Sequence, residues 1–203
     1  MPTADQNRTE RRSRARIATR AAILQAARRI AERDGARNLS LRSVAAEAGF
    51  APAALYGYFH NKGELMLALA ADDLSRIAHA MRQATSQQVP GSKFAAAASA
   101  ALDFLTHTET LAAASAAMAA GADNSEVQRL FNGRLIVALT ALSAAAGNPA
   151  RSRGAQADVV LLAATLAGLA MLRRAGPLQA LGFSVEEMLD RVEAHFSRMK
   201  EAA

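Results

Sequence analysis

Residues 40–62, SLRSVAAEAGFAPAALYGYFHNK, constrain the fold more than any other stretch of the chain. Two short helical segments are joined at Gly49, which supplies the positive φ that a tight turn between helices requires. Ser40 is a good N-cap for the first segment, and Pro52 takes the first position of the second, where its missing N–H costs nothing. The apolar residues that two crossed helices would bury are Val44, Phe50, Leu55 and Tyr58. The spacing predicts a helix-turn-helix, a unit that places its second helix in the major groove of DNA.

A third helix is predicted before this motif, from about Arg16 to Asp34, and Gly35 ends it. One face of this helix is apolar and consists of Ile23, Leu24, Ala27, Ile30 and Ala31. Three helices with a shared apolar face form a small bundle. A bundle of roughly 50 residues is marginally stable alone, so we expect it to pack against later helices of the chain.

The segments RAAILQAARRIAERDG, LRSVAAEAGF and LYGYFHNKGEL resemble the N-terminal domain of TetR/AcrR-type transcriptional regulators. The resemblance covers about Arg16 to Leu69 and departs from the family pattern at two positions. Ala51 stands where the family usually has Ser or Thr as the cap of the recognition helix, and Gly63 stands where it usually has an acid. A missing capping hydroxyl costs about 1 kcal/mol, so the helix start is weakened while the motif stays readable.

The positive charge of the chain is confined to the segment that holds the motif. Residues 1–64 contain twelve Lys/Arg and six Asp/Glu, whereas residues 65–203 contain twelve of each. Such an asymmetry favours binding to a polyanion. The arginines of an N-terminal run are Arg8, Arg11, Arg12, Arg14, Arg16 and Arg20. Alone, this run has the composition of a solvated tail; beside a helix-turn-helix we interpret residues 1–15 as a flexible arm that contacts phosphates or the minor groove.

Other classes of protein find little support in the sequence. The chain has no cysteine, and its histidines at 60, 79, 107 and 195 lack metal-ligand spacing, so we expect neither a metal nor another cofactor. No catalytic or phosphate-binding motif appears, and we expect no enzymatic activity and no catalytic residue. The longest apolar run, Val159–Leu172, has 14 residues, fewer than the roughly 18–20 that span a bilayer. We therefore expect a cytoplasmic protein without a membrane segment.

The pattern after residue 61 is helical throughout, so the predicted fold class is all-α with about nine helices. The domains expected are the arm at 1–15, a DNA-binding domain at 16–61 with its motif at about 40–59, and an effector-binding and dimerisation domain at 62–203. The helices expected in the last domain run over about 62–86, 92–106, 109–121, 125–146, 154–175 and 184–201.

A homodimer is expected because the run at 159–172 is apolar almost all round, which indicates burial on two sides. The interface residues predicted on the last two helices are Leu162, Leu166, Leu169, Val185, Met188, Leu189, Val192 and Phe196.

The resemblance assigns roles at the DNA site. Arg42 matches a position where family members often carry a base-contacting arginine, and bidentate contact with guanine is the chemistry available to it. Tyr58 and Lys62 are expected to contact the DNA backbone, and Tyr56 a base or a phosphate. The complete predicted set is Arg42, Ser40, Ser43, Pro52, Ala53, Tyr56, Tyr58, Lys62, Arg11, Arg12, Arg14 and Arg16. The partner expected is a near-palindromic duplex.

Residues 95–120 include 13 alanines among 26 residues. One interpretation is close helix packing, and the other is a void that receives a small, largely apolar effector. The walls of such a void would be Phe94, Phe104, Leu105, His107, Met118, Phe131, Leu135 and Met171. The function predicted is a repressor that the effector releases from its operator. The alternative is a regulator of the same fold that is controlled by a protein partner or is constitutive, with no small-molecule effector.

Overall fold

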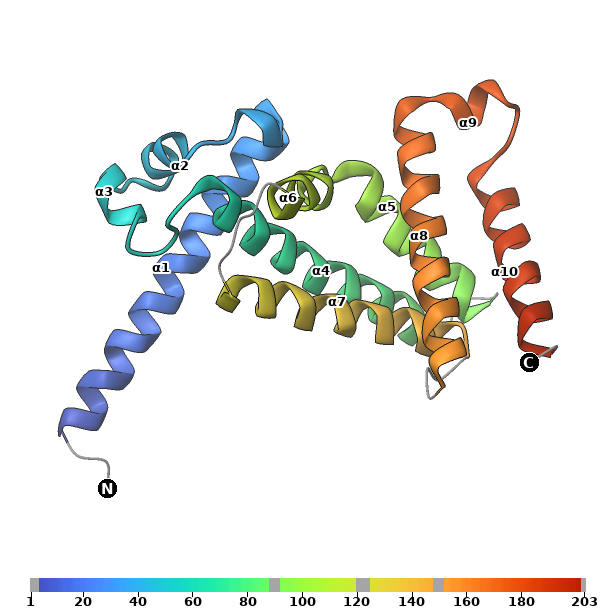
Figure 1. Ribbon diagram of the computed structural model, residues 1–203, viewed down its shortest axis with the longest axis horizontal. Coiled ribbons are helices and arrows are strands. Elements are labelled where there is room, and N and C mark those ends of the chain that lie inside the picture. The colour runs from blue at the N-terminus through green and yellow to red at the C-terminus, as the bar shows by residue number, and fades with distance from the viewer. Residues whose placement is uncertain (1–3, 88–91, 120–124, 148–151, 202–203) are drawn as a thin grey trace. The chain divides into compact units, whose positions relative to one another are not determined.

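The computed structural model describes residues 4–87, 92–119, 125–147 and 152–201, and in this part of the chain every regular element is a helix. The all-α prediction is confirmed. The α-helices, labelled in Figure 1, are α1 (Ala4–Asp34), α2 (Leu41–Ala48), α3 (Pro52–Leu55), α4 (Lys62–Ser86), α5 (Lys93–His107), α6 (Thr110–Ala119), α7 (Ser125–Ala145), α8 (Arg153–Ala175), α9 (Pro177–Ala180) and α10 (Val185–Glu201). A short 3-10 helix, η1 (Ala36–Asn38), lies between α1 and α2 in the sequence.

The chain divides into two compact units. The first consists of Met1–Ala70 and Glu109–Gln128, and the second of Ala71–Thr108 and Arg129–Ala203. Helix α4 begins in the first unit and ends in the second, so the division falls inside this helix rather than at its first residue.

In the first unit, α1 packs on α2 and α2 packs on α3. The apolar face predicted for α1 is largely buried, with Ile23, Ala27 and Ile30 at 2% exposure or less. Val44, Leu55 and Phe59 are fully buried beneath the turn. At the rim of this core, Glu47 of α2 accepts hydrogen bonds from Arg29 Nε at 2.8 Å and from Arg33 at 3.4 Å. These pairs join the polar edges of α1 and α2.

The start of α1 differs from the prediction. The helix begins at Ala4 instead of near Arg16, so the described part of the predicted arm is helical. Residues 4–15 contain neither Pro nor Gly, and four of them are Arg, a good helix former. A Glu10–Arg14 pair at 3.3 Å adds an i,i+4 contact. These first turns project beyond α2 and α3 (Figure 1). The side chains from Gln6 to Ala18 are exposed.

In the second unit, α5, α8 and α10 pack on one another. The buried positions of α5 are Phe94, Ala97, Ala98, Ala101 and Leu102, and those of α8 are Val159, Leu162, Leu166, Leu169 and Ala170. An ion pair of 2.6 Å joins Arg173 of α8 to Asp103 of α5. The hydroxyl of Ser92, which caps α5, hydrogen-bonds the carboxylate of Glu193 on α10. Polar contacts at both ends of α5 therefore fix its register against its neighbours.

Five residues predicted for a dimer interface are core residues of their own chain. Leu162, Leu166, Leu169, Leu189 and Val192 are at most 8% exposed, whereas Val185, Met188 and Phe196 are half-buried. The physical reason is that an all-round apolar run does not reveal which of its sides faces its own domain. The outward side of α8 carries Val160, Leu161, Met171 and Leu172 instead. The dimer interface itself stays a prediction.

Two further details of the second unit bear on the sequence reasoning. The short helix α9 is not among the predicted helices; Gly176, with a left-handed φ of 89°, ends α8 and Pro177 starts the new turn. Ser184 caps α10 by accepting a hydrogen bond from the Glu187 N–H at 3.0 Å. Helix α8, at 23 residues, is long and apolar enough to cross a membrane by length and composition, but a helix buried in a protein core passes the same test. Its buried face and its pairing with α5 are features of such a packed helix.

Candidate nucleic-acid interface

The turn between α2 and α3 has the geometry that the sequence predicts. Gly49 has a φ of 74°, a left-handed conformation that glycine adopts without strain. Its N–H donates to the Ala46 carbonyl at 3.2 Å, and the Phe50 N–H donates to the Ala45 carbonyl at 2.9 Å. This pair of bonds is a Schellman motif, which satisfies the last carbonyls of α2 while the chain reverses. Ala45 is fully buried, so only a small side chain fits there.

The first turn of α2 is fixed by two serines. The Ser43 N–H donates to the Ser40 hydroxyl oxygen at 3.0 Å, and the Ser40 N–H donates to the Ser43 hydroxyl oxygen at 3.1 Å. This reciprocal capping box engages both hydroxyl groups that were predicted to contact DNA. Arg42 lies between them with an exposed side chain, and it makes no side-chain hydrogen bond or ion pair with the described residues. The capping box therefore positions a free guanidinium at the start of α2.

Helix α3 presents an apolar outer face. Pro52, Ala53 and Ala54 are exposed, Tyr56 is 56% exposed, and Leu55 is fully buried beneath them. Ala51 makes no side-chain cap, in line with the missing hydroxyl noted in the sequence. The surface offered by α3 is thus suited to contact with thymine methyl groups and to one hydroxyl contact from Tyr56.

Arg16, predicted to contact DNA, holds the recognition segment in place. Its guanidinium donates to the Gly57 carbonyl at 3.1 Å and lies 5.2 Å from the centre of the Tyr58 ring. Arg20, one helical turn further on, lies 5.2 Å from the centre of the buried Phe59 ring. These contacts tie α1 to the end of the motif. The sequence run predicts basic residues here but cannot separate those that point outward from those that pack on aromatic rings.

Lys62 likewise has a partner within the unit. Its ammonium group donates to the Arg37 carbonyl at 2.7 Å, which connects the start of α4 to η1. The acid missing at Gly63 is supplied one residue later, because Glu64 accepts from the His60 N–H at 2.6 Å and lies 2.9 Å from His60 Nδ1. The Glu64 N–H in turn donates to the Asn61 side chain at 2.8 Å. This cap was not predicted, although Asn61, three residues before Glu64, is a sequence signal for it.

Two carboxylates of the first unit have lowered pKa values. The hydrogen bond from Arg29, with a further one from Arg33, holds the pKa of Glu47 below its ordinary value of 4.5, although partial burial opposes this. The hydrogen bond from Arg33 likewise lowers the pKa of Asp34. Both carboxylates favour their charged form, so the α1–α2 edge keeps its ion pairs at neutral pH.

The residues predicted to line an effector void differ in their burial and are divided between the two units. Phe94 is buried, Leu135 and Met171 are exposed, and Met118 belongs to the first unit while the others belong to the second. Phe104 packs under the guanidinium of Arg76, at 5.1 Å from the ring centre. His107 is exposed, and its Nδ1 lies 2.7 Å from the Asp103 carbonyl oxygen of its own helix. The remaining two, Leu105 and Phe131, are half-buried.

The alanine tract is packed core where it is buried. Ala97, Ala98, Ala101 and Ala114 are at most 3% exposed. Small side chains let helices approach closely, so the tract closes space instead of opening it. The burial of these four residues supports the packing interpretation, and the effector pocket stays a prediction.

Together, a Schellman turn, a capped helix with a free outward arginine and a second helix with an exposed face define a helix-turn-helix DNA-binding protein. Residues 23–69 match the family model described as bacterial regulatory proteins, tetR family. The chain thus carries an N-terminal domain of the tetR-family type. No curated protein matches it.

Solved structures share the fold over most of the chain. A protein of unknown function from Rhodococcus sp. RHA1 is 29% identical, with a TM-score of 0.65, over 89% of this chain and 94% of its own. FadR from Bacillus subtilis, solved in complex with stearoyl-CoA, is 16% identical with a TM-score of 0.57, over 87% and 96%. The TetR family regulator PfmR from Thermus thermophilus is 17% identical with a TM-score of 0.56, over 87% and 97%.

Proposed function

We propose that this regulator is a cytoplasmic homodimeric repressor that binds a near-palindromic operator and leaves it when a small molecule binds the second unit. The observation that carries the DNA-binding part is the motif, with Arg42 outward and α3 exposed between anchored core residues. The +6 charge of residues 1–64 supports it.

In this proposal Arg42 reads a base, and Tyr56, Pro52 and Ala53 contact the major groove surface. Arg11 and Arg12 contact phosphates from the first turns of α1, which are exposed. A helix is too wide for a narrow minor groove, so the helical start of α1 supports backbone contacts in place of an inserted arm. Arg16, Tyr58, Lys62, Ser40 and Ser43 position the motif.

A dimer supplies the two-fold symmetry that a near-palindrome requires. Val160, Leu161, Met171 and Leu172 form the outward apolar face of α8, and Leu181 and Phe183 extend exposed apolar surface beyond α9. Monomers in water rarely keep such surface uncovered, which supports a second copy as the partner.

We propose that the effector acts through helix α4. Helix α4 contributes residues to both units, so a ligand that favours one setting of this helix would alter the spacing of the two DNA-binding heads. The structural neighbour solved with stearoyl-CoA supports a small molecule as the signal.

The test is operator binding by the purified full-length chain. Immunoprecipitation of fragmented genomic DNA with the protein, followed by anisotropy titration of a recovered duplex, should give a near-palindromic site. We expect its affinity to fall steeply as salt rises, as phosphate contacts require. A scrambled duplex of equal composition is the control. Equal affinity for the two duplexes at all salt concentrations would contradict sequence-specific binding.

A further inference from the structure

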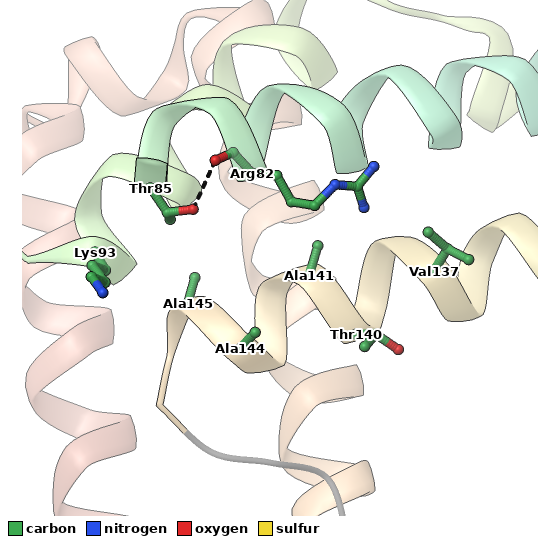
Figure 2. Close-up of a pocket in the computed structure, with 8 residues that line it drawn as sticks. All are labelled: Arg82, Thr85, Lys93, Val137, Thr140, Ala141, Ala144 and Ala145. Carbon is green, nitrogen blue, oxygen red and sulfur yellow. Dashed lines mark hydrogen bonds between the residues drawn. The ribbon is translucent and has the colours of Figure 1, made fainter. Parts of the chain in front are cut away.

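The second unit contains an open cavity of about 450 Å³ that the sequence reasoning did not anticipate. Its lining residues, drawn in Figure 2, are Arg82, Thr85, Lys93, Val137, Thr140, Ala141, Ala144 and Ala145. They come from the end of α4, the start of α5 and the second half of α7. The volume is in the range of sites that hold small molecules.

One side of this cavity is a face of α7 with small side chains. Ala141, Ala144 and Ala145 recur at the spacing that places residues on one helical face, and Val137 continues it (Figure 2). The Thr140 hydroxyl donates to the Ile136 carbonyl at 2.8 Å, and the Thr85 hydroxyl donates to the Arg82 carbonyl at 3.0 Å. Because both hydroxyl protons are used within their own helices, this side offers mainly apolar contact.

The polar side of the cavity is cationic. Arg82 extends from α4 above Ala141, and Lys93 lies beyond Ala145 (Figure 2). Neither side chain makes a hydrogen bond or an ion pair with the residues that the structure describes, and none of the lining residues is acidic. The neighbouring sequence segments 88–91 and 148–151 contain no Asp or Glu either. By contrast, Arg173 in the same unit is paired with Asp103.

Two cations that make no ion pair with the described residues, beside an apolar face, favour a ligand that has both an anionic group and an apolar part. A guanidinium binds a carboxylate or a phosphate through two parallel hydrogen bonds, and an ammonium adds a second point charge. The alanine face would take an apolar tail. We propose that this cavity binds an amphipathic small molecule with an anionic head, carboxylate or phosphate, which is bound by Arg82 while Lys93, at the other end of the alanine face, adds to the positive potential of the cavity. The sequence, by contrast, predicts a largely apolar effector lined by other residues.

Calorimetric titration of the full-length protein tests the site with defined probes. Decanoate and decyl phosphate, below their micelle concentrations, supply the two head groups, and decanol supplies the same tail without charge. We expect at least one anion to bind about tenfold or more tighter than decanol. Arg82→Gln with Lys93→Gln should weaken anion binding about tenfold or more, whereas the control Arg134→Gln, an exposed arginine elsewhere on α7, should change it less than twofold.

A second variant tests the apolar side. Ala144 is exposed in the cavity, so Ala144→Leu should weaken anion binding by occupying space, with an unchanged melting temperature because no packed core is disturbed. Equal affinity for decanol and both anions, or full anion binding by the double variant, would overturn the proposal.

Only the role of the site as an effector site rests on the proposed function, and operator binding measured in the same samples separates the two. Anion binding through Arg82 and Lys93 without a change in operator affinity would uphold the site and refute release by this ligand. Specific operator binding with no anion binding would refute the site and leave the DNA-binding function intact.

Discussion

At the scale of single residues, similar side chains near the motif have different tasks. Arg42 is exposed without a partner among the described residues, whereas Arg16 uses its guanidinium on the Gly57 carbonyl and the Tyr58 ring. Charge and position in the sequence predict both as DNA contacts. They cannot predict the difference, because it depends on where the aromatic rings after α3 come to lie against α1.

Substitution of Arg42 tests its role as a base reader. Arg42→Ala should weaken operator binding by roughly 1–3 kcal/mol and relax the preference at one position in each half-site. Anisotropy titrations against the operator and its single-base variants measure this, with Arg134→Ala as the control for charge. An equal loss of affinity for operator and random DNA would show that Arg42 contacts only the backbone.

The positioning role of Arg16 predicts another pattern. Arg16→Ala should lower stability by roughly 1 kcal/mol, the worth of a typical hydrogen bond, and weaken operator binding without changing the slope of affinity against salt. Arg12→Ala should do the reverse: the slope falls by about one and the melting temperature stays the same. If both variants lower the slope equally, Arg16 is a phosphate contact after all.

At the scale of elements, the sequence predicts helix ends better than helix faces. The bounds predicted for α4, 62–86, match the structure because the breaking signal at Pro90-Gly91 is local in the sequence. Helix α1 begins twelve residues earlier than predicted, since residues 4–15 have no apolar periodicity from which a helix could be predicted. The sequence did not show which side of α8 is buried in its own domain, because the run is apolar on all sides.

The outward apolar face of α8 predicts where two copies of the chain meet in a dimer. Val160 and Met171 are eleven residues apart, three helical turns, and are 54% and 64% exposed. The double variant Val160→Lys with Met171→Lys should sediment as a folded monomer at micromolar concentration, whereas Asn132→Lys at an exposed position of α7 should remain dimeric. A dimer that survives the double substitution would place the interface elsewhere.

The α1–α2 edge predicts a dependence on pH. The pKa of Glu47 is lower in the folded chain than its ordinary value of 4.5, so its contribution to stability is present above that value and is lost as pH falls through the folded pKa. Glu47→Gln should therefore lower the melting temperature at pH 7 but make little difference once the pH is below the folded pKa of Glu47. Thermal melts across this range, with Glu32→Gln on the exposed side of α1 as the control, measure it. A constant difference at every pH would mean that the charge of Glu47 is immaterial.

At the scale of the whole molecule, the resemblance of a short motif predicts the fold class and the order of domains, since three helices of fixed spacing admit few architectures. The cavity was beyond prediction, because it depends on which faces of α4, α5 and α7 meet. Its two cations, Arg82 and Lys93, lie 11 residues apart in a region whose net charge is zero. The charge balance of this region therefore does not indicate a cationic site.

Helix α4 belongs to both units, and this continuity affects how the protein unfolds. Its backbone hydrogen bonds run without interruption from Lys62 to Ser86, through the division between the units at Ala70–Ala71. Loss of either unit would leave half of this helix without its packing, and a short isolated helix is marginal in water. The two units should consequently unfold in one calorimetric transition, and the amide protons on the two sides of Ala70 should exchange with solvent through the same global opening. Two separate transitions would show that the helix can break at the division.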